Sequence, residues 1–157
     1  MVILHLPKDE EIVDFEKLVL GQAYRFTDRA FIREALQGPS IYNHDGQKTL
    51  ALVGDAILRQ SLVEQGRERS ETPVSLTEEI QNVITKVASN INLYYRGIAL
   101  GLDPFIVKNP GQLGITAGRK TMATTMEAII GAVFYDSAKN GDDLKRVLIA
   151  LGLAWPE

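Results

Sequence analysis

The sequence predicts an all-α protein, and three observations support this fold class. Apolar residues recur every three or four positions along most of the 157 residues, which is the period of an amphipathic helix. No stretch has the sustained alternation of apolar and polar residues that a half-buried strand requires, and we find no internal repeat or low-complexity tract. Apolar residues make up 45% of the chain, which is enough for one well-formed core. We therefore expect a single helical domain over residues 1–157.

Three helices are expected in the first half of the chain, where apolar residues mark one face of each. They occupy residues 12–19, 31–36 and 50–65. The second should end at Gly38-Pro39, because this pair breaks helices. A polar connector over residues 66–73 should follow the third.

The second half begins with Ser75-Leu76-Thr77-Glu78, which has the pattern of a capping box. In this motif the Ser hydroxyl and the Glu carboxylate satisfy free amides of the first helical turn. We expect it to open one helix that runs to about Leu100, followed by an irregular glycine-containing loop. Two further helices are expected at residues 121–138 and 142–151.

The composition excludes several classes of protein. Without cysteine, the chain has neither a disulfide framework nor a thiolate metal site. Its apolar runs are too short to span a membrane, and its first residues turn acidic where a signal peptide stays apolar and a transit peptide is basic. We expect an intracellular, cytoplasmic protein with no membrane association. His5 and His44 lack a second ligand at metal spacing and are expected at the surface.

The net charge of −3 restricts any surface that binds nucleic acid, because phosphate binding depends on clustered Lys and Arg. Such a surface would have to be local. Each isolated basic residue is also consistent with an ordinary solvated face. The candidates are Lys86, Arg96, Lys108, Arg119 and Lys120.

Two carboxylates lie in apolar helical stretches. Asp55 lies within Leu-Ala-Leu-Val-Gly-Asp-Ala-Ile-Leu, and Glu127 within Thr-Thr-Met-Glu-Ala-Ile-Ile-Gly-Ala-Val-Phe. Burying a carboxylate is costly unless it is paired, hydrogen-bonded or bound to a metal, so both are candidate functional residues. Ala51 and Thr124 lie one turn before them on the same helical faces. Packing the two helices together would therefore gather four side chains.

Each of these stretches also contains a glycine, Gly54 in the first and Gly131 in the second. Glycine inside a helix costs about 1 kcal/mol relative to Ala, so the absence of a side chain should bring a gain at both positions. Close helix packing is the gain that we expect.

The two stretches resemble those of the ribonuclease III family, whose signature helix ends in a Leu-Gly-Asp-Ala-like sequence and whose later helix carries Glu-Ala before an apolar run. The segment Ser89-Asn90-Ile91-Asn92-Leu93 is similar to the family's Ser-Asn-x-x-Leu. Tyr24-Arg25-Phe26-Thr27-Asp28, with Ala35-Leu36 after it, is similar to the family's N-terminal helical hairpin. The blocks occur in the family's order over about residues 12–153, so the resemblance implies the multi-helix endonuclease domain.

The resemblance implies divalent-metal-dependent cleavage of double-stranded RNA. In larger family members all four gathered positions are acidic and collect metal, whereas here Ala51 and Thr124 replace two of the acids. Mini-ribonuclease III, the minimal branch, is similar in carrying Ala and Thr there. Because Mg²⁺ is commonly held by one or two carboxylates, Asp55 and Glu127 are expected to bind Mg²⁺, or Mn²⁺ in its place. Thr124 and Asn90 are expected to support them from outside the metal's contacts.

The resemblance also implies a homodimer and a local RNA surface. Leu52 and Val53 on the signature helix are the expected dimer contacts, although plain core residues would look the same. Arg119 and Lys120 become the stronger RNA-binding candidates. Because the chain ends soon after the nuclease region, we expect no separate double-stranded-RNA-binding domain.

Two alternatives to the enzyme remain open from the sequence. The first is a catalytically degenerate ribonuclease III-like subunit that binds RNA or serves as a structural component, for example in a mitochondrial ribosome, with a mitochondrial location. The missing acids and the acidic net charge favour it. The second is a dimerising helical protein with no role in RNA metabolism.

Overall fold

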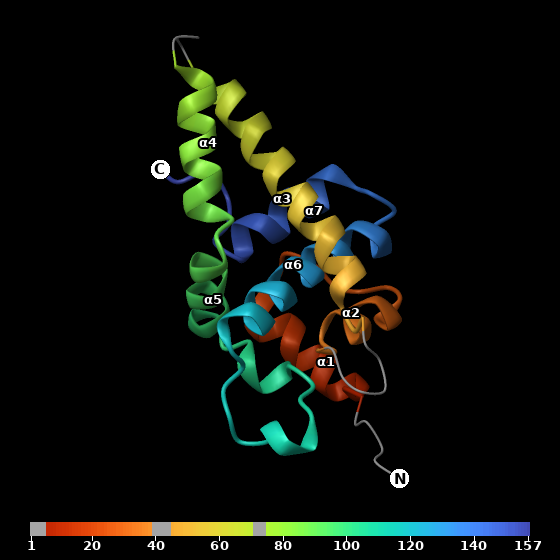
Figure 1. Ribbon diagram of the computed structural model, residues 1–157. Helices are drawn as coiled ribbons and strands as arrows, with labels where there is room; N and C mark the ends of the chain where they lie inside the picture. The colour runs from red at the N-terminus through yellow and green to blue at the C-terminus, as the bar shows by residue number, and fades with distance from the viewer. Residues whose placement is uncertain (1–5, 39–44, 71–74) are drawn as a thin grey trace.

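The computed structural model describes residues 6–38, 45–70 and 75–157, and it confirms the all-α class (Figure 1). Within these ranges the chain forms helices and an isolated bridge between Gln37 and Val107, without a β-strand. None of the helices described combines the length and the apolarity that crossing a bilayer requires. Two short 3-10 helices, η2 (Asp103–Phe105) and η3 (Pro110–Gln112), lie in the connection before α6. The longer elements are α1 (Asp9–Phe15), continued by the π-helical turn η1 (Glu16–Leu20), α2 (Arg29–Ala35), α3 (Lys48–Arg69), α4 (Leu76–Val87), α5 (Asn90–Ala99), α6 (Arg119–Asp136) and α7 (Gly141–Ala150).

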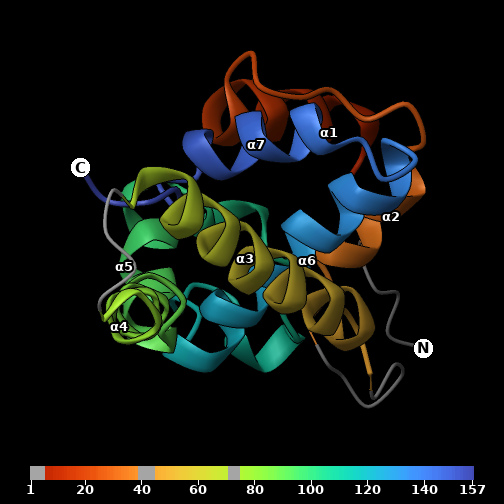
Figure 2. The same cartoon turned by 90° about the horizontal axis from the view of Figure 1, so that it is seen from above.

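Helix α6 is the central element of the domain. It packs against α2, α3, α5 and α7, and nearly all of its side chains between Met122 and Val133 are buried. Seen from above, α3 crosses α6, with α1 and α7 on one side of this pair and α4 and α5 on the other (Figure 2). Thr124 and Glu127 are the exceptions within the buried stretch, because both side chains are only partly buried. The core helix thus brings one polar face to the surface.

Two glycines allow α3 and α6 to cross at backbone contact. A Cβ at Gly54 of α3 would overlap the carbonyl oxygen of Glu127 and lie 2.6 Å from its carbonyl carbon. A Cβ at Gly131 of α6 would overlap the carbonyl oxygen of Leu50 and lie 2.9 Å from its carbonyl carbon. The missing side chains let the two backbones approach closely. This gain offsets the cost of glycine inside a helix, as expected from the sequence.

The N-terminal segment is tied to the end of α6 by Asp136. The Asp136 carboxylate accepts hydrogen bonds from the Tyr24 hydroxyl at 2.6 Å and from the backbone amides of Thr27 and Asp28 at 2.9 and 2.7 Å. Burial, the hydrogen bond and the charge of Asp136 all raise the pKa of the Tyr24 hydroxyl. Asp28 then caps α2 by accepting from the Ala30 amide at 2.9 Å. Residues 24–28 therefore have a structural role: their hydrogen bonds to Asp136, called the clasp below, join the N-terminal segment to the end of α6.

The expected single helix from Ser75 to Leu100 is wrong, because the structure has two helices here. Ser75 adopts a left-handed conformation (φ 64°) and makes no side-chain cap, so the expected capping box does not form. The chain breaks after Val87, where Ser89 caps α5 by accepting from the Asn92 amide at 3.2 Å. The Asn92 side chain donates back to the Val87 carbonyl at 2.7 Å, which closes the corner. Ser and Asn compete well with helix hydrogen bonding, which explains the break.

Helix α3 extends four residues beyond its expected end at Gln65. Gly66 remains helical and brings the helix close to its neighbours, because a side chain there would meet Ile80 at 2.6 Å and Trp155 at 2.8 Å. The Gln65 side chain accepts a hydrogen bond from the Trp155 amide at 2.9 Å, so the C-terminal segment is anchored on α3. Residues 71–73 of the expected connector, and also Pro39, His5 and His44, lie outside the described residues.

Candidate functional site

The crossing of α3 and α6 forms one wall of an open hollow of about 530 Å³. It lies where the first half of α3 meets the first half of α6, which Figure 1 shows crossing near the middle of the molecule. Its lining residues are Lys48, Ala51, Leu52 and Asp55 of α3 together with Lys120, Thr121, Thr124 and Glu127 of α6. The four positions that helical spacing was expected to gather are therefore all present.

Asp55 and Glu127 are close enough to share a hydrogen bond. Burial, followed by the negative charge of Asp55 and that hydrogen bond, raises the pKa of Glu127 from 4.5 to about 8, while Arg59 opposes the shift. Two carboxylates at such short range cannot both ionise freely, so one proton is retained between them. At neutral pH, Glu127 is therefore largely protonated in the absence of a cation. A cation between the two carboxylates would replace this proton.

Arg59 fixes the orientation of Asp55. It lies one turn later on α3, and its Nε donates to both Asp55 carboxylate oxygens, at 3.0 and 3.1 Å. The Arg59 side chain is 52% exposed, so the ion pair lies at the mouth of the hollow rather than in the core. A neutral Glu127 and the Asp55-Arg59 pair together leave these three side chains with no net charge.

Thr124 and Ala51 occupy the positions where larger relatives were expected to carry acids. The Thr124 side chain is half-buried in the hollow, and Ala51 is buried beside it. The surrounding turns are braced by Gln47, which donates to the Thr125 hydroxyl at 2.7 Å. That hydroxyl in turn donates to the Thr121 carbonyl at 2.7 Å. The start of α3 is thus held against the first turns of α6, where Thr124 lies.

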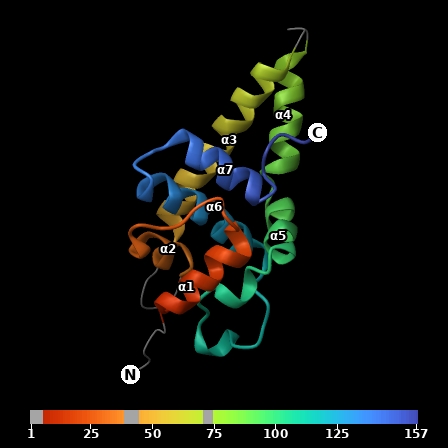
Figure 3. The ribbon, with the colours of Figure 1, turned by 180° about the vertical axis from the view of Figure 1, so that it is seen from behind.

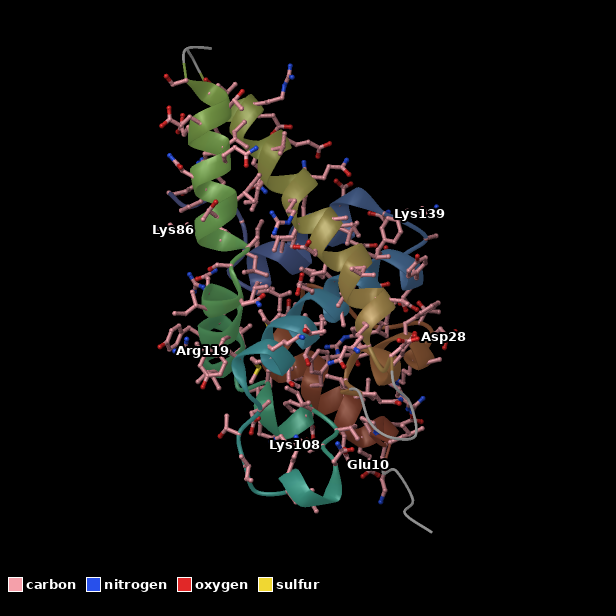
Figure 4. The ribbon with its side chains drawn as sticks, viewed as in Figure 1. Glu10, Asp28, Lys86, Lys108, Arg119 and Lys139 are labelled. Atoms are coloured by element: carbon pink, nitrogen blue, oxygen red, sulfur yellow. The ribbon has the colours of Figure 1, made fainter. Side chains whose placement is uncertain are left out.

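Two of the five basic candidates lie at or beside the hollow. Lys120 lines it, and Arg119 is exposed at the adjacent first residue of α6 (Figure 4). Lys86, at the end of α4, and Arg96, on α5, instead line a separate hollow near the C-terminal segment.

Lys108 differs from the other candidates because its charge is already neutralised. Its ammonium lies 2.9 Å from a carboxylate oxygen of Asp103, and its side chain is only 14% exposed. The Asp103 carboxylate also accepts a hydrogen bond from the Ala117 amide, at 2.8 Å. Lys108 therefore helps to hold the connection before α6 in its fold. The structure does not bring Lys108 to the hollow that Asp55 and Glu127 line.

Of the other expected site residues, some line the hollow and some do not. Asn90 is exposed at the first turn of α5 and does not line the hollow, so the structure does not place it beside Asp55. Leu52 lines the hollow and is 73% exposed, which is unusual for a leucine in the middle of a helix pair. Val53 is half-buried.

Sequence reasoning missed Lys48, Arg59 and Thr121. Lys48 lies two turns before Asp55 and Arg59 lies one turn after it, so helical spacing alone places both near the carboxylate. The charges of Lys48 and Arg59 are equally consistent with an ordinary solvated helix face. The missing signal was that they share a face with a carboxylate that the apolar pattern had already singled out.

The donor set fits a small hard cation. Asp55 and Glu127 supply carboxylate oxygens, which are donors that Mg²⁺ and Mn²⁺ favour, and the Thr124 hydroxyl lines the same hollow. Across the described ranges, no group of three or more His, Cys, Asp and Glu side chains is placed to hold a metal. Mg²⁺ keeps several waters and needs only one or two carboxylates, so a pair is sufficient.

In fold, the chain is a nuclease domain of the ribonuclease III type. The nuclease domain of ribonuclease III from Campylobacter jejuni matches 94% of this chain and 98% of its own length with a TM-score of 0.72 at 19% identity. A second structure of that nuclease domain matches with a TM-score of 0.69 at 20% identity, covering 88% of this chain and 94% of its own length. The ribonuclease III domain model matches residues 48–138, which is more than half of the chain. The chain belongs to the ribonuclease III family.

Curated relatives extend beyond the matched region. Ribonuclease 3 of Shewanella halifaxensis is 28% identical over 130 residues, which cover 82% of this chain and 56% of that protein. Ribonuclease 3 of Pseudoalteromonas translucida is 30% identical over 118 residues, which cover 73% of this chain and 50% of that protein. The chain thus spans about half the length of the curated relatives it matches.

Proposed function

We propose that this protein is a divalent-metal-dependent endoribonuclease that cleaves double-stranded RNA. The observation that carries the proposal is the contact between Asp55 and Glu127 in an open hollow, where burial and then the charge of Asp55 raise the pKa of Glu127 to about 8. A strongly perturbed carboxylate beside a second charged group in a cleft is typical of functional sites. Family membership supplies the reaction class.

Asp55 and Glu127 would hold Mg²⁺ or Mn²⁺, with the Thr124 hydroxyl available to orient water. When bound, such an ion lowers the pKa of water, polarises a phosphoryl oxygen and offsets charge on the leaving 3′ oxygen. The chain's own contribution is positional. Arg59 holds the Asp55 carboxylate in one orientation, and the backbone contact at Gly54 sets how far it lies from Glu127.

Lys48 and Lys120 would bind backbone phosphates on either side of the carboxylates. Both line the hollow, one from α3 and one from α6, so they flank the place where the scissile phosphate would lie. Arg119 extends this basic edge along the surface. Their local clustering supports RNA binding despite a net charge of −3. A-form RNA would be read through its shape, its phosphates and its 2′-hydroxyls.

The cleavage test compares the purified protein with Asp55→Asn and Glu127→Gln on a long RNA duplex in Mg²⁺ and in Mn²⁺. We expect the parent to cut the duplex and spare single strands, while both variants lose cleavage and remain folded. Glu68→Gln, at an exposed position on α3, is the matched control and should cut normally. A parent protein that binds the duplex but leaves it uncut in both metals would make the chain an RNA-binding subunit rather than a nuclease.

Ala51→Glu with Thr124→Asp separates the two possible causes of a negative result. Both positions already line the hollow, so the double change would rebuild a four-carboxylate site; because Ala51 is buried, circular dichroism should first show that the variant folds. A gain of cleavage would show that the missing acids had been limiting. Continued inactivity would place the defect elsewhere.

We further propose a homodimer formed through α3. The apolar residues Leu52, Ala56 and Val63 are exposed along one side of this helix, whereas Leu50 and Leu58 are buried within the domain. In the nuclease domain of Campylobacter jejuni ribonuclease III, a structurally flexible region is involved in dimer formation. Pairing about a two-fold axis would cover Leu52 on both copies at once.

Sedimentation velocity at micromolar concentration tests the dimer. Leu52→Glu should give a monomer, because a carboxylate would be buried at the interface. Ile149→Glu is the matched control. Ile149 on α7 is similarly exposed, at 67%, but lies outside the row of exposed apolar residues on α3. A parent protein that sediments as a monomer would contradict the proposal.

A further inference from the structure

A second hollow of about 310 Å³ lies between the corner of α4 and α5 and the C-terminal segment. Figure 3 shows that segment returning from α7 toward α4 and α5 on the rear of the molecule. This hollow shares no lining residue with the hollow between α3 and α6. Its volume is at the lower end of the range for small-ligand sites. The residues that matter to its chemistry are Lys86, Asn92, Arg96, Gly152 and Trp155.

The Arg96 guanidinium lies close to the backbone of Gly152. A Cβ at Gly152 would lie 3.0 Å from the Arg96 Nη1 atom and 3.1 Å from both its Cζ and its Nε. Gly152 also has φ 74°, a left-handed conformation that other residues rarely adopt. The left-handed backbone is what favours glycine at this position, because the exposed guanidinium could shift to admit a side chain. The Arg96 side chain is otherwise exposed, so its guanidinium is accessible to an anion that enters the hollow.

The charge around this hollow is positive and unpaired. Lys86 lines it from the last turn of α4, and none of its lining residues is acidic. Within the part of the chain that the structure describes, neither Lys86 nor Arg96 forms an ion pair. Lys86 also lines a neighbouring hollow together with Glu78 and Glu79, two turns earlier on α4, but it forms no ion pair with either carboxylate. Two cations that face one space repel each other unless an anion lies between them.

We propose that this hollow binds a phosphate group. A planar guanidinium fork and an ammonium are the side chains that bind phosphate oxygens most strongly, the first with two parallel hydrogen bonds and the second as a point charge. Asn92 is already committed to the Val87 carbonyl, so the two cations carry the recognition. The phosphate belongs either to a free phosphate ester or to the backbone of an RNA strand. Because it lies in a separate hollow, the site does not depend on the proposed cleavage reaction.

Trp155 makes the proposal directly measurable. It is the only tryptophan in the sequence and it lines this hollow, so intrinsic tryptophan fluorescence reports on the hollow alone. Titration of the full chain with inorganic phosphate, against chloride at equal ionic strength and with EDTA present, should give a saturable change. Arg96→Gln and Lys86→Gln should each weaken phosphate binding about ten-fold, because each removes a charge-assisted contact. Lys145→Gln, at an exposed position on α7, should leave binding unchanged.

The same variants distinguish the two sources of the phosphate. If the site binds RNA backbone, Arg96→Gln weakens binding of a short RNA duplex in EDTA and lowers the salt dependence by about one phosphate contact. If it binds a free ester, a 5′-mononucleotide saturates the fluorescence change and duplex binding is unaffected by Arg96→Gln. The proposal is overturned if phosphate gives no saturable change, or if the exposed Lys86→Gln, which should fold normally, binds phosphate as the parent does.

Discussion

Glu127→Gln should stabilise the metal-free protein at alkaline pH and leave it nearly unchanged at acidic pH. Glutamine has the shape of protonated glutamic acid, and its amide can donate to Asp55 as the shared proton does. In the parent protein the folded state holds this proton up to about pH 8, whereas the unfolded chain releases it near pH 4.5. Between these values the folded state binds more protons, so the free energy of unfolding falls as pH rises.

The size of this effect follows from the same two pKa values. At about 1.4 kcal/mol for each pH unit, the interval from 4.5 to about 8 sets an upper limit of about 5 kcal/mol. Glu127 is only half-buried, so solvent screening reduces this, and we expect a loss of about 2 kcal/mol. The loss should be complete above pH 8 and absent below pH 4.5. The variant, which cannot ionise at this position, should not show it.

Urea unfolding followed by circular dichroism at pH 5, 6.5 and 8.5, with EDTA present, measures this difference. The stability advantage of Glu127→Gln should grow steadily with pH, whereas Glu68→Gln should give a difference that does not vary with pH. Adding Mn²⁺ at pH 8.5 should stabilise the parent more than the variant, because only the parent has both carboxylates. A constant advantage at all three pH values would refute the assignment of a shared proton to Asp55 and Glu127.

Three further predictions concern the helix crossing, the ion pair beside Asp55 and the hydrogen bonds of Asp136. Gly54→Ala should lower the free energy of unfolding by about 3 kcal/mol, because its Cβ overlaps the Glu127 backbone, while Gly111→Ala, with open space around it, should not; equal melting temperatures would contradict this. Arg59→Gln should bind Mn²⁺ about three-fold more tightly by calorimetry, since removing an exposed ion-pair partner of Asp55 is worth about 0.5–1 kcal/mol, which should exceed the loss of its orienting effect; weaker binding would contradict this order of the two effects. Asp136→Asn should destabilise the fold by about 2 kcal/mol and increase hydrogen exchange at the Thr27 and Asp28 amides first; unchanged exchange there would exclude the clasp.

The pairing of the two carboxylates could be predicted from sequence because it depends on only two regularities. Helical spacing placed each acid on a defined face, and the glycines beside them indicated close helix packing. Both regularities are local or nearly so, and the structure confirms the resulting contact at Gly54 and Gly131. The family resemblance added the expected partner for each helix.

The break between α4 and α5 could not be predicted in the same way. Ser75 and Ser89 are both followed by helix-forming sequence, and each is a plausible N-cap on local grounds. The choice between them depends on tertiary structure, since Asn92 closes the corner at Val87 only when α5 turns to pack on α6. Likewise, the neutralisation of Lys108 depends on Asp103, which reaches it only after the loop before α6 has folded. Charge in a sequence does not reveal whether it will be paired.

The contact between the α3 and α6 backbones also separates the geometry of the hollow from its chemistry. Because glycine lets main chain meet main chain, no side chain at the crossing acts as the spacer that sets the gap between residues 55 and 127. A partly buried residue that faces the hollow, such as Thr124, can then change between acidic and neutral types while the gap stays the same. Over evolutionary time, such a frame can gain or lose metal ligands one at a time without refolding. The same frame makes this domain a suitable host for engineered oxygen-donor sites.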